Sequence, residues 1–235
     1  MASAENTGTV ADQWRSNKRL AAMWDKGVKN KGVSLVYSAI VFGTDNRKMY
    51  QHMAALSRLP EGTSVLDVPS GGGILFHTLR PGSKLKYTAA DISQLMLDRA
   101  RDEAAKRGLH DLEFREADAE AMPFDDHSFD VVASYSGLHC MPHPEVAVRE
   151  MFRVLRPGGR LLGSSAIRGA NPVSDRFINL WVKRRILDVT VPGPTFVGWL
   201  RDAGFTDLKI SRSGAILYFE GTRPELAEKP ERGEE

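Results

Sequence analysis

The chain has 235 residues, of which 42% are hydrophobic and 26% charged, and a formal net charge of +2. These values are ordinary for a globular domain, and so small a net charge gives no argument by itself for nucleic acid or an anionic membrane as a partner. The single cysteine, Cys140, excludes an internal disulfide and fits a reducing compartment. No apolar run approaches the ~20 residues of a membrane-spanning helix, and the first residues lack a signal-peptide pattern. We therefore expect a cytoplasmic protein without membrane insertion.

Residues 1–60 predict an N-terminal helical layer. Residues 1–12 are small and polar, and we expect them to be frayed. Residues 13–31 and 46–59 place apolar side chains on one helical face. A turn composition at residues 60–62 ends the layer. Simple packing onto a sheet would explain this layer, and its aromatic residues could equally contribute to a pocket wall.

The most informative stretch follows at residues 65–73, where a short apolar run ends in three consecutive glycines. A helix-like segment covers residues 74–80. Strand, glycine turn and helix in this order allow a backbone to approach a nucleotide-like ligand closely. Asp67 lies inside the apolar run, and a buried carboxylate is costly unless it is paired. We therefore expect a cofactor loop, with a cationic ligand or N–H donors beside Asp67.

Strands and helices then alternate along the chain. Apolar strand patterns cover residues 84–90, 112–115, 129–134 and 160–165, and helical patterns lie between them. This alternation predicts a parallel sheet with helices on both faces. Counted from the strand before the glycines, residues 84–90 and 112–115 are the second and third strands. Asp91 directly follows the second, and the third leads to Asp118.

Two departures complete the predicted fold. Residues 168–192 form a helical cap insert, and after a helix over residues 195–203 two strands, 208–212 and 215–220, are joined by a tight turn. The hairpin leaves one strand antiparallel. We predict a three-layer α/β, Rossmann-like fold with a seven-stranded, mostly parallel sheet and helices on both faces. The predicted divisions are 1–60 for the helical layer, 61–221 for the main domain and 222–235 for a tail.

The glycine loop argues against one cofactor and resembles the site of another. Residues 69–73 do not fit the G-x-G-x-x-G register of a dinucleotide dehydrogenase. Residues 65–73 instead resemble the first motif of the class I S-adenosylmethionine-dependent methyltransferases, and Asp91 matches the acidic residue that ends their second strand. Residues 118–130 and 150–159 are similar to the type 11 branch, which includes ubiquinone and menaquinone methyltransferases. Pro69 departs from the family, whose loop usually begins with glycine there.

This resemblance implies where the cofactor, S-adenosylmethionine, would bind. Asp91 would accept hydrogen bonds from the ribose hydroxyls, and Asp118 would accept one from the adenine amine. Ser134 or Tyr135 would face the methionine end. The predicted cofactor-binding residues are Asp67, Ser70, Gly71, Gly73, Asp91, Ile92, Met96, Asp118, Ala119, Ser134 and Tyr135. Each acidic residue alone could be a helix cap or part of a solvated loop, but three at successive strand ends favour one ligand.

The predicted reaction requires few catalytic side chains. Methyl transfer from a sulfonium is an in-line displacement, so positioning and desolvation can supply most of the rate. His139 is the candidate catalytic base, with a structural hydrogen bond in its loop as the alternative. No metal is expected at His139, Cys140 and His143. Pro142 and Pro144 break the helical spacing there, and no further ligand is evident.

The aromatic residues of the cap and of the N-terminal layer favour an apolar, covered acceptor site. The predicted substrate-binding residues are Trp24, Tyr37, Phe42, His139, Phe177 and Trp181. Trp199 is a further aromatic residue that we attribute to the cap, although most of these side chains could equally belong to the core. The preferred hypothesis is methylation of an oxygen or carbon of an apolar or aromatic small molecule.

Two rival functions remain open. Methylation of RNA or protein would require a basic, open face, and the residues that could form one, Lys183-Arg184-Arg185, are more simply interpreted as a solvated helix face. The fourth strand also lacks the Asn/Asp-Pro-Pro-aromatic signature that resembles nucleobase amino-group methylation, so no nucleic-acid partner is expected. The other rival is a non-catalytic partner protein that keeps the fold. The acceptor's identity and the oligomeric state are not encoded in a recognisable motif.

Overall fold

The computed structural model describes residues 9–17 and 31–225. Trp24 and residues 226–235 of the predicted tail lie outside the described residues. Among the residues that are described, no helix combines the length and apolar character needed to cross a bilayer.

The centre of the protein is a seven-stranded sheet in the order β3-β2-β1-β4-β5-β7-β6. The strands are β1 Ser64–Asp67, β2 Lys86–Asp91, β3 Leu112–Glu116, β4 Phe129–Tyr135, β5 Leu155–Ala166, β6 Thr206–Ser213 and β7 Ile216–Thr222. β7 runs antiparallel to both of its neighbours, β5 and β6, whereas the pairs from β3 to β5 are all parallel. The predicted fold class is therefore confirmed. The strand order reverses between β1 and β4, which is where α/β sheets of this kind open a ligand crevice.

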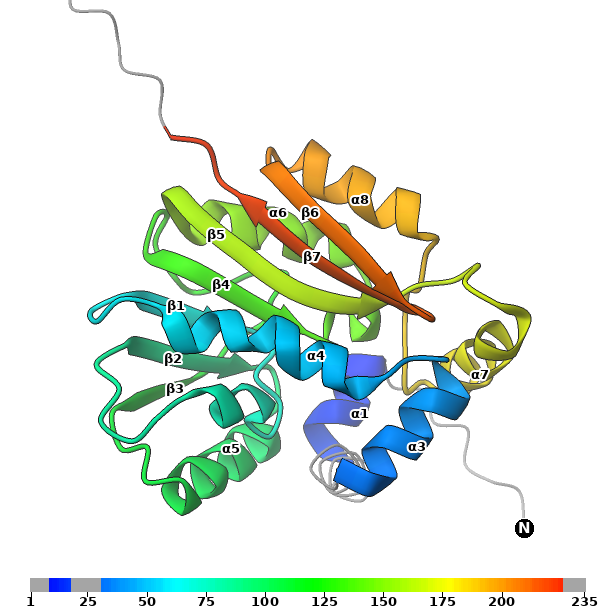
Figure 1. The fold of residues 1–235 in the computed structure, drawn as a ribbon, viewed down its shortest axis with the longest axis horizontal. Helices are drawn as coiled ribbons and strands as arrows, with labels where there is room; N and C mark the ends of the chain where they lie inside the picture. The colour runs from blue at the N-terminus through cyan, green and yellow to red at the C-terminus, as the bar shows by residue number, and fades with distance from the viewer. Residues whose placement is uncertain (1–8, 18–30, 226–235) are drawn as a thin grey trace, which may run out of the picture.

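Helices cover both faces of the sheet, with α4 in front and α6 behind it in the view of Figure 1. The α-helices are α1 Val10–Ser16, α3 Lys31–Val41, α4 Asn46–Met53, α5 Gln94–Lys106, α6 Pro144–Val154, α7 Pro172–Lys183 and α8 Gly193–Asp202. Short 3-10 helices are η1 Ala54–Arg58, η2 Ile74–Thr78 and η3 Leu138–Cys140.

Each face of the sheet has its own apolar core. On one face, Leu56, Phe76 and Ala100 pack from the helical side against Tyr87 and Val131 of the strands. On the opposite face, side chains of α6 and α8 pack against β4, β5 and β7. Trp199 belongs to this second core, next to Phe196 of α8. The attribution of Trp199 to the cap was therefore wrong, because its helix packs on the face of the sheet.

Helices α1, α3 and α7 gather at the end of the sheet to which the parallel strands point (Figure 1). Helices α3 and α7 contact each other, and their shared core includes Phe42 and Trp181, whose rings meet edge to face with centroids 5.7 Å apart. The backbone N–H of Ala215 donates to the carbonyl oxygen of Phe42 at 2.7 Å. These contacts join the insert and the N-terminal helices into one cap, which is fastened to the β6–β7 hairpin.

Two element boundaries differ from those expected. Helix α1 begins at Val10, within residues 1–12 that we expected to be frayed, because Thr9 and Asp12 form a capping box. Strand β5 begins at Leu155 rather than at residue 160. Its glycine turn forms a bulge, so the pairing with β4 jumps from Leu155 to Arg160 while the extended chain continues.

Gly214, in the turn of the β6–β7 hairpin, has no room for a side chain. Gly214 has φ +55°, and a Cβ there would collide with the carbonyl oxygens of Phe42 and Gly43. We expect Gly214→Ala to lower the free energy of unfolding, measured in urea, by more than about 1 kcal/mol. Gly62→Ala is the matched control, because Gly62 also has a positive φ but nothing within 4 Å of its Cβ position. Equal losses in the two variants would contradict the packing argument.

Candidate functional site

The glycine loop turns at the end of β1 with little side-chain bulk. Gly71 and Gly73 have φ angles of +53° and +83°, which disfavour other residues. A Cβ on Gly73 would also collide with the ring of Phe76. The loop is held to the neighbouring strand because the N–H of Ser70 donates to the carbonyl oxygen of Ala90 at 2.8 Å. The Val68–Pro69 peptide bond is cis in this structure.

Asp91, the last residue of β2, joins that loop to the start of the next helix. One carboxylate oxygen accepts from the N–H of Gly71 and the other from the N–H of Ser93, both at 2.9 Å. Asp91 is only 5% exposed. Burial raises the pKa of its carboxyl to about 6, and the two N–H donors partly offset that effect. A buried, hydrogen-bonded carboxylate beside a glycine turn fits a ligand that presents hydroxyl donors.

The end of β3 lies next to this carboxylate, because the N–H of Ala117 donates to the carbonyl oxygen of Asp91 at 3.1 Å. Ala119 is buried there, and Met96 from α5 approaches the loop, with its Cε 3.6 Å from the position of a Cβ on Gly71. Asp118 is exposed, and its carboxylate accepts from the N–H of Glu120 at 2.9 Å. The fold thus brings these residues to one edge of the sheet, while Asp118 currently caps its own turn.

Helix α1 covers this edge. The hydroxyl of Ser93 donates to the carbonyl oxygen of Trp14 at 2.7 Å. Helices α1 and α5 contact each other. The N-terminal layer therefore closes over the end of β2 as well as the end of the sheet near α3.

Asp67 has a partner that the sequence did not reveal. It is 1% exposed, and the hydroxyl of Tyr87 donates to its carboxylate at 2.8 Å. Burial raises the pKa of Asp67 well above its usual range, and the hydrogen bond from Tyr87 opposes part of that rise. The strand register explains the pair, since Ala89 lies opposite Asp67 and Tyr87 is two residues earlier on the same face. Strand alternation was the only available signal for Tyr87.

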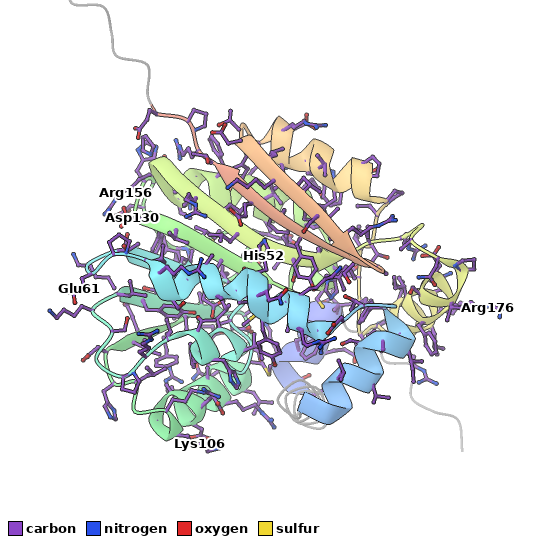
Figure 2. The ribbon with its side chains drawn as sticks, viewed as in Figure 1. His52, Glu61, Lys106, Asp130, Arg156 and Arg176 are labelled. Carbon is purple, nitrogen blue, oxygen red and sulfur yellow. The ribbon has the colours of Figure 1, made fainter. Side chains whose placement is uncertain are left out.

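His52 was also missed. The Tyr135 hydroxyl and His52 Nδ1 are 2.7 Å apart, although 83 positions separate the residues in the chain. His52 comes from α4 and lies between that helix and the strands (Figure 2), where its ring also contacts Tyr218. Burial lowers the pKa of His52 and raises that of Tyr135, so the neutral pair is favoured. No local sequence pattern signals this contact, because it depends on where α4 crosses the sheet.

His139 is almost completely buried, at 2% exposed. Its Nδ1 accepts from the N–H of Ala166 at 3.0 Å, and burial lowers its pKa to about 4. The neutral ring therefore carries its proton on Nε2, which has no hydrogen-bond partner among the described residues. The structural hydrogen bond considered as the alternative for His139 is present, and a pKa near 4 makes the ring a weak base.

Two buried hydroxyls of the predicted site are likewise without partners in the described part of the chain, those of Ser70 and Ser134. Buried polar groups are normally satisfied, so these atoms fit a site that receives a polar ligand. Over the described ranges, no group of three or more His, Cys, Asp or Glu side chains is arranged to hold a metal ion.

The structure places three of the predicted substrate residues in the core of the cap. Phe42, Phe177 and Trp181 pack within the core of the cap, together with Cys140 next to His139. Core packing is therefore enough to explain these three aromatic side chains. Through Cys140, the core of the cap reaches the loop after β4. Tyr37 lies on α3, and Trp24 is in the part of the chain that the structure does not describe.

Part of the chain is similar in sequence to known proteins. Residues 66–163 match the methyltransferase-domain family of type 11. The Brucella canis protein named ubiquinone/menaquinone biosynthesis C-methyltransferase UbiE is 42% identical over 135 residues, which are 56% of this chain and 50% of that protein. The chain thus spans about half the length of the curated relatives it matches.

Solved structures share the fold over more of the chain. One chain of the complex between the Haloferax volcanii Trm112 methyltransferase activator and a methyltransferase matches with a TM-score of 0.69 at 22% identity. The match covers 94% of this chain and 100% of that chain. A phosphoethanolamine N-methyltransferase from Haemonchus contortus, solved with S-adenosylhomocysteine, has a TM-score of 0.66 at 17% identity, covering 88% of this chain and 61% of its own. At these identities the similarity establishes the fold alone.

The Tyr87–Asp67 hydrogen bond predicts a measurable loss of stability. We expect Tyr87→Phe to lower the free energy of unfolding by about 1–3 kcal/mol near neutral pH, because a buried carboxyl loses its donor. Urea titration provides the measurement. Tyr50→Phe, at a half-buried tyrosine that packs against the same core, is the control for removing a hydroxyl. The interpretation fails if both variants lose the same amount.

Proposed function

We propose that the chain is a class I S-adenosylmethionine-dependent methyltransferase of the type 11 branch, which residues 66–163 match, and that it transfers a methyl group to an oxygen or carbon of an apolar or aromatic small molecule. The observation that carries this proposal is Asp91, a buried carboxylate in contact with the glycine loop. S-adenosylmethionine would supply an electrophilic methyl group on a sulfonium. The protein's own part is to bind, orient and exclude water.

We assign the cofactor to the strand ends around that carboxylate. The Asp91 carboxylate would accept hydrogen bonds from the ribose hydroxyls, either in place of its backbone N–H donors or in addition to them. Ile92 and Met96 would flank the adenine, with Asp118 and Ala119 at its polar edge. The free hydroxyls of Ser70 and Ser134 support a polar ligand group beyond the loop, and the buried Asp67 would gain from a cationic amine nearby.

For the transfer step we propose that His139 acts as a hydrogen-bond donor rather than as a base. Its Nε2 carries the proton when Nδ1 accepts from Ala166, and its low pKa keeps the ring neutral. A neutral donor in a dry site can stabilise negative charge on an acceptor oxygen. Tyr135, hydrogen-bonded to His52, is the second group that could hold a proton near this edge.

The acceptor class follows from the cap. Helices α1, α3 and α7 lie over the end of the sheet (Figure 1), and this favours a small, enclosed acceptor over RNA or protein. The curated relatives are named as C-methyltransferases, which supports carbon as the methylated atom. A cytoplasmic location remains a prediction from the single cysteine.

The ionisation of Asp91 predicts a pH dependence of cofactor binding. Hydrogen bonds donated by ribose hydroxyls require the ionised carboxylate, whose pKa in the free protein is raised to about 6. We expect calorimetric affinity for S-adenosylhomocysteine to rise about tenfold from pH 5 to 7, with about half of that affinity reached at pH 6, and to level off above pH 7. Asp91→Asn should bind more weakly at pH 7.5 and lose this dependence. Equal affinity in both proteins would remove Asp91 from the site.

Methyl transfer itself is tested with labelled S-adenosylmethionine and a panel of phenols, quinones and other apolar acceptors. The proposal predicts labelled product with at least one acceptor, and a rate reduced ~100-fold in His139→Ala, as for loss of an oxyanion donor. His143→Ala is the control, because His143 is exposed and bonded to Glu120. Cofactor binding without transfer to any acceptor would favour the non-catalytic partner protein, and transfer only to RNA or protein would overturn the acceptor class.

A further inference from the structure

The large hydrophobic side chains that remain exposed are concentrated on two helices. Across the described ranges there are six, namely Leu35, Val36, Ile40, Val173, Leu180 and Ile210. All but Ile210 lie on α3 and α7, which contact each other. Val36, Ile40 and Val173 are each more than half exposed, at 59%, 58% and 56%. Scattered exposed apolar residues are normal, but a group of this kind usually marks an interaction surface.

Cationic side chains accompany these residues on α7. Val173 and Leu180 are seven positions apart and share a helical face with Arg176. Figure 2 shows Arg176 pointing away from the body of the protein. Lys183 and Arg184 are exposed at the C-terminal end of the same helix. Asp175, the acidic residue of α7, is engaged with the N–H of Gly169 at 3.0 Å.

We call this surface the outer cap face; it comprises Leu35, Val36, Ile40, Val173 and Leu180 with Arg176, Lys183 and Arg184. The opposite sides of its two helices already pack in the cap core through Phe42, Ile178 and Trp181. The exposed apolar side chains are therefore not needed for the packing of the cap. The face also lies at the end of the sheet where the parallel strands terminate (Figure 1).

Charge distinguishes the occupants of such a face. A second copy paired face to face about a two-fold axis would bring together two surfaces that each carry Arg176, Lys183 and Arg184, and like charges in one interface are unfavourable. A nucleic acid would pair with the cations but leave the apolar side chains without a partner. An anionic bilayer surface offers partners to the cationic and to the apolar side chains, because apolar side chains enter the headgroup boundary while Lys and Arg contact the lipid phosphates.

We propose that the outer cap face docks the protein peripherally on an anionic lipid bilayer. The helices lie along the surface and do not cross it. Docking there would place the cap, and the acceptor site beneath it, next to the phase in which an apolar acceptor dissolves. That last consequence rests on the proposed function, whereas docking itself rests only on the exposed side chains.

The test is flotation of the native chain with vesicles of phosphatidylcholine alone or mixed with phosphatidylglycerol. We expect binding to the mixed vesicles that weakens as salt is added, and little binding to phosphatidylcholine alone. Val36→Asp and Val173→Asp should each reduce binding at least ~tenfold, and so should the double change Lys183→Glu with Arg184→Glu. Ile210→Asp is the matched control, because Ile210 is exposed to 39% on β6, outside the face, and it should bind like the native chain.

The outcomes separate this proposal from its rivals. Thermal unfolding of each variant establishes that it is folded before its binding is compared. No flotation of the native chain, or equal loss in Ile210→Asp and Val36→Asp, overturns the docking proposal. A native dimer in sedimentation that Val36→Asp dissociates, without vesicle binding, assigns the face to a second copy instead. None of these readouts requires methyl transfer, so failure of the proposed function leaves the test intact.

Discussion

The site depends on one carboxylate holding two backbone segments. Asp91 accepts from the N–H of Gly71 on one side and of Ser93 on the other, so one side chain at the end of β2 joins the glycine loop to the start of α5. Its burial makes ionisation costly, which is why the pKa of the carboxyl is raised. A ligand that donates hydrogen bonds to this carboxylate would relieve the cost, so binding and ionisation are coupled.

Behind the loop, two pairs of polar side chains lie on one face of the sheet within an otherwise apolar core. Tyr87 with Asp67 and His52 with Tyr135 are each joined by a short hydrogen bond. In such surroundings a satisfied pair stabilises a unique arrangement, whereas an unsatisfied member is expensive. These pairs therefore constrain how β1, β2, β4 and α4 sit against one another just behind the proposed methionine end of the site.

The cap presents apolar side chains in two directions. Its inner side is a core formed with the β6–β7 hairpin, and Phe42 illustrates how that core is used, because its ring meets Trp181 while its carbonyl oxygen accepts from Ala215. Its outer side has no such partner among the described residues. The net charge of +2 conceals this arrangement, because acidic residues elsewhere balance the cations at the end of α7. Net charge thus says little about a local surface.

The sequence by itself determined the alternating strands and helices, the glycine loop and the position of Asp91 at a strand end, because periodicity and turn chemistry act over a few residues. It also indicated the antiparallel hairpin, though not the bulge that extends β5. Only the tertiary structure decided that Tyr87 meets Asp67, that His52 meets Tyr135 from 83 positions away, and that Phe42 and Trp181 form a cap core. Those contacts depend on strand register and on where helices cross the sheet, and neither is a property of a local segment.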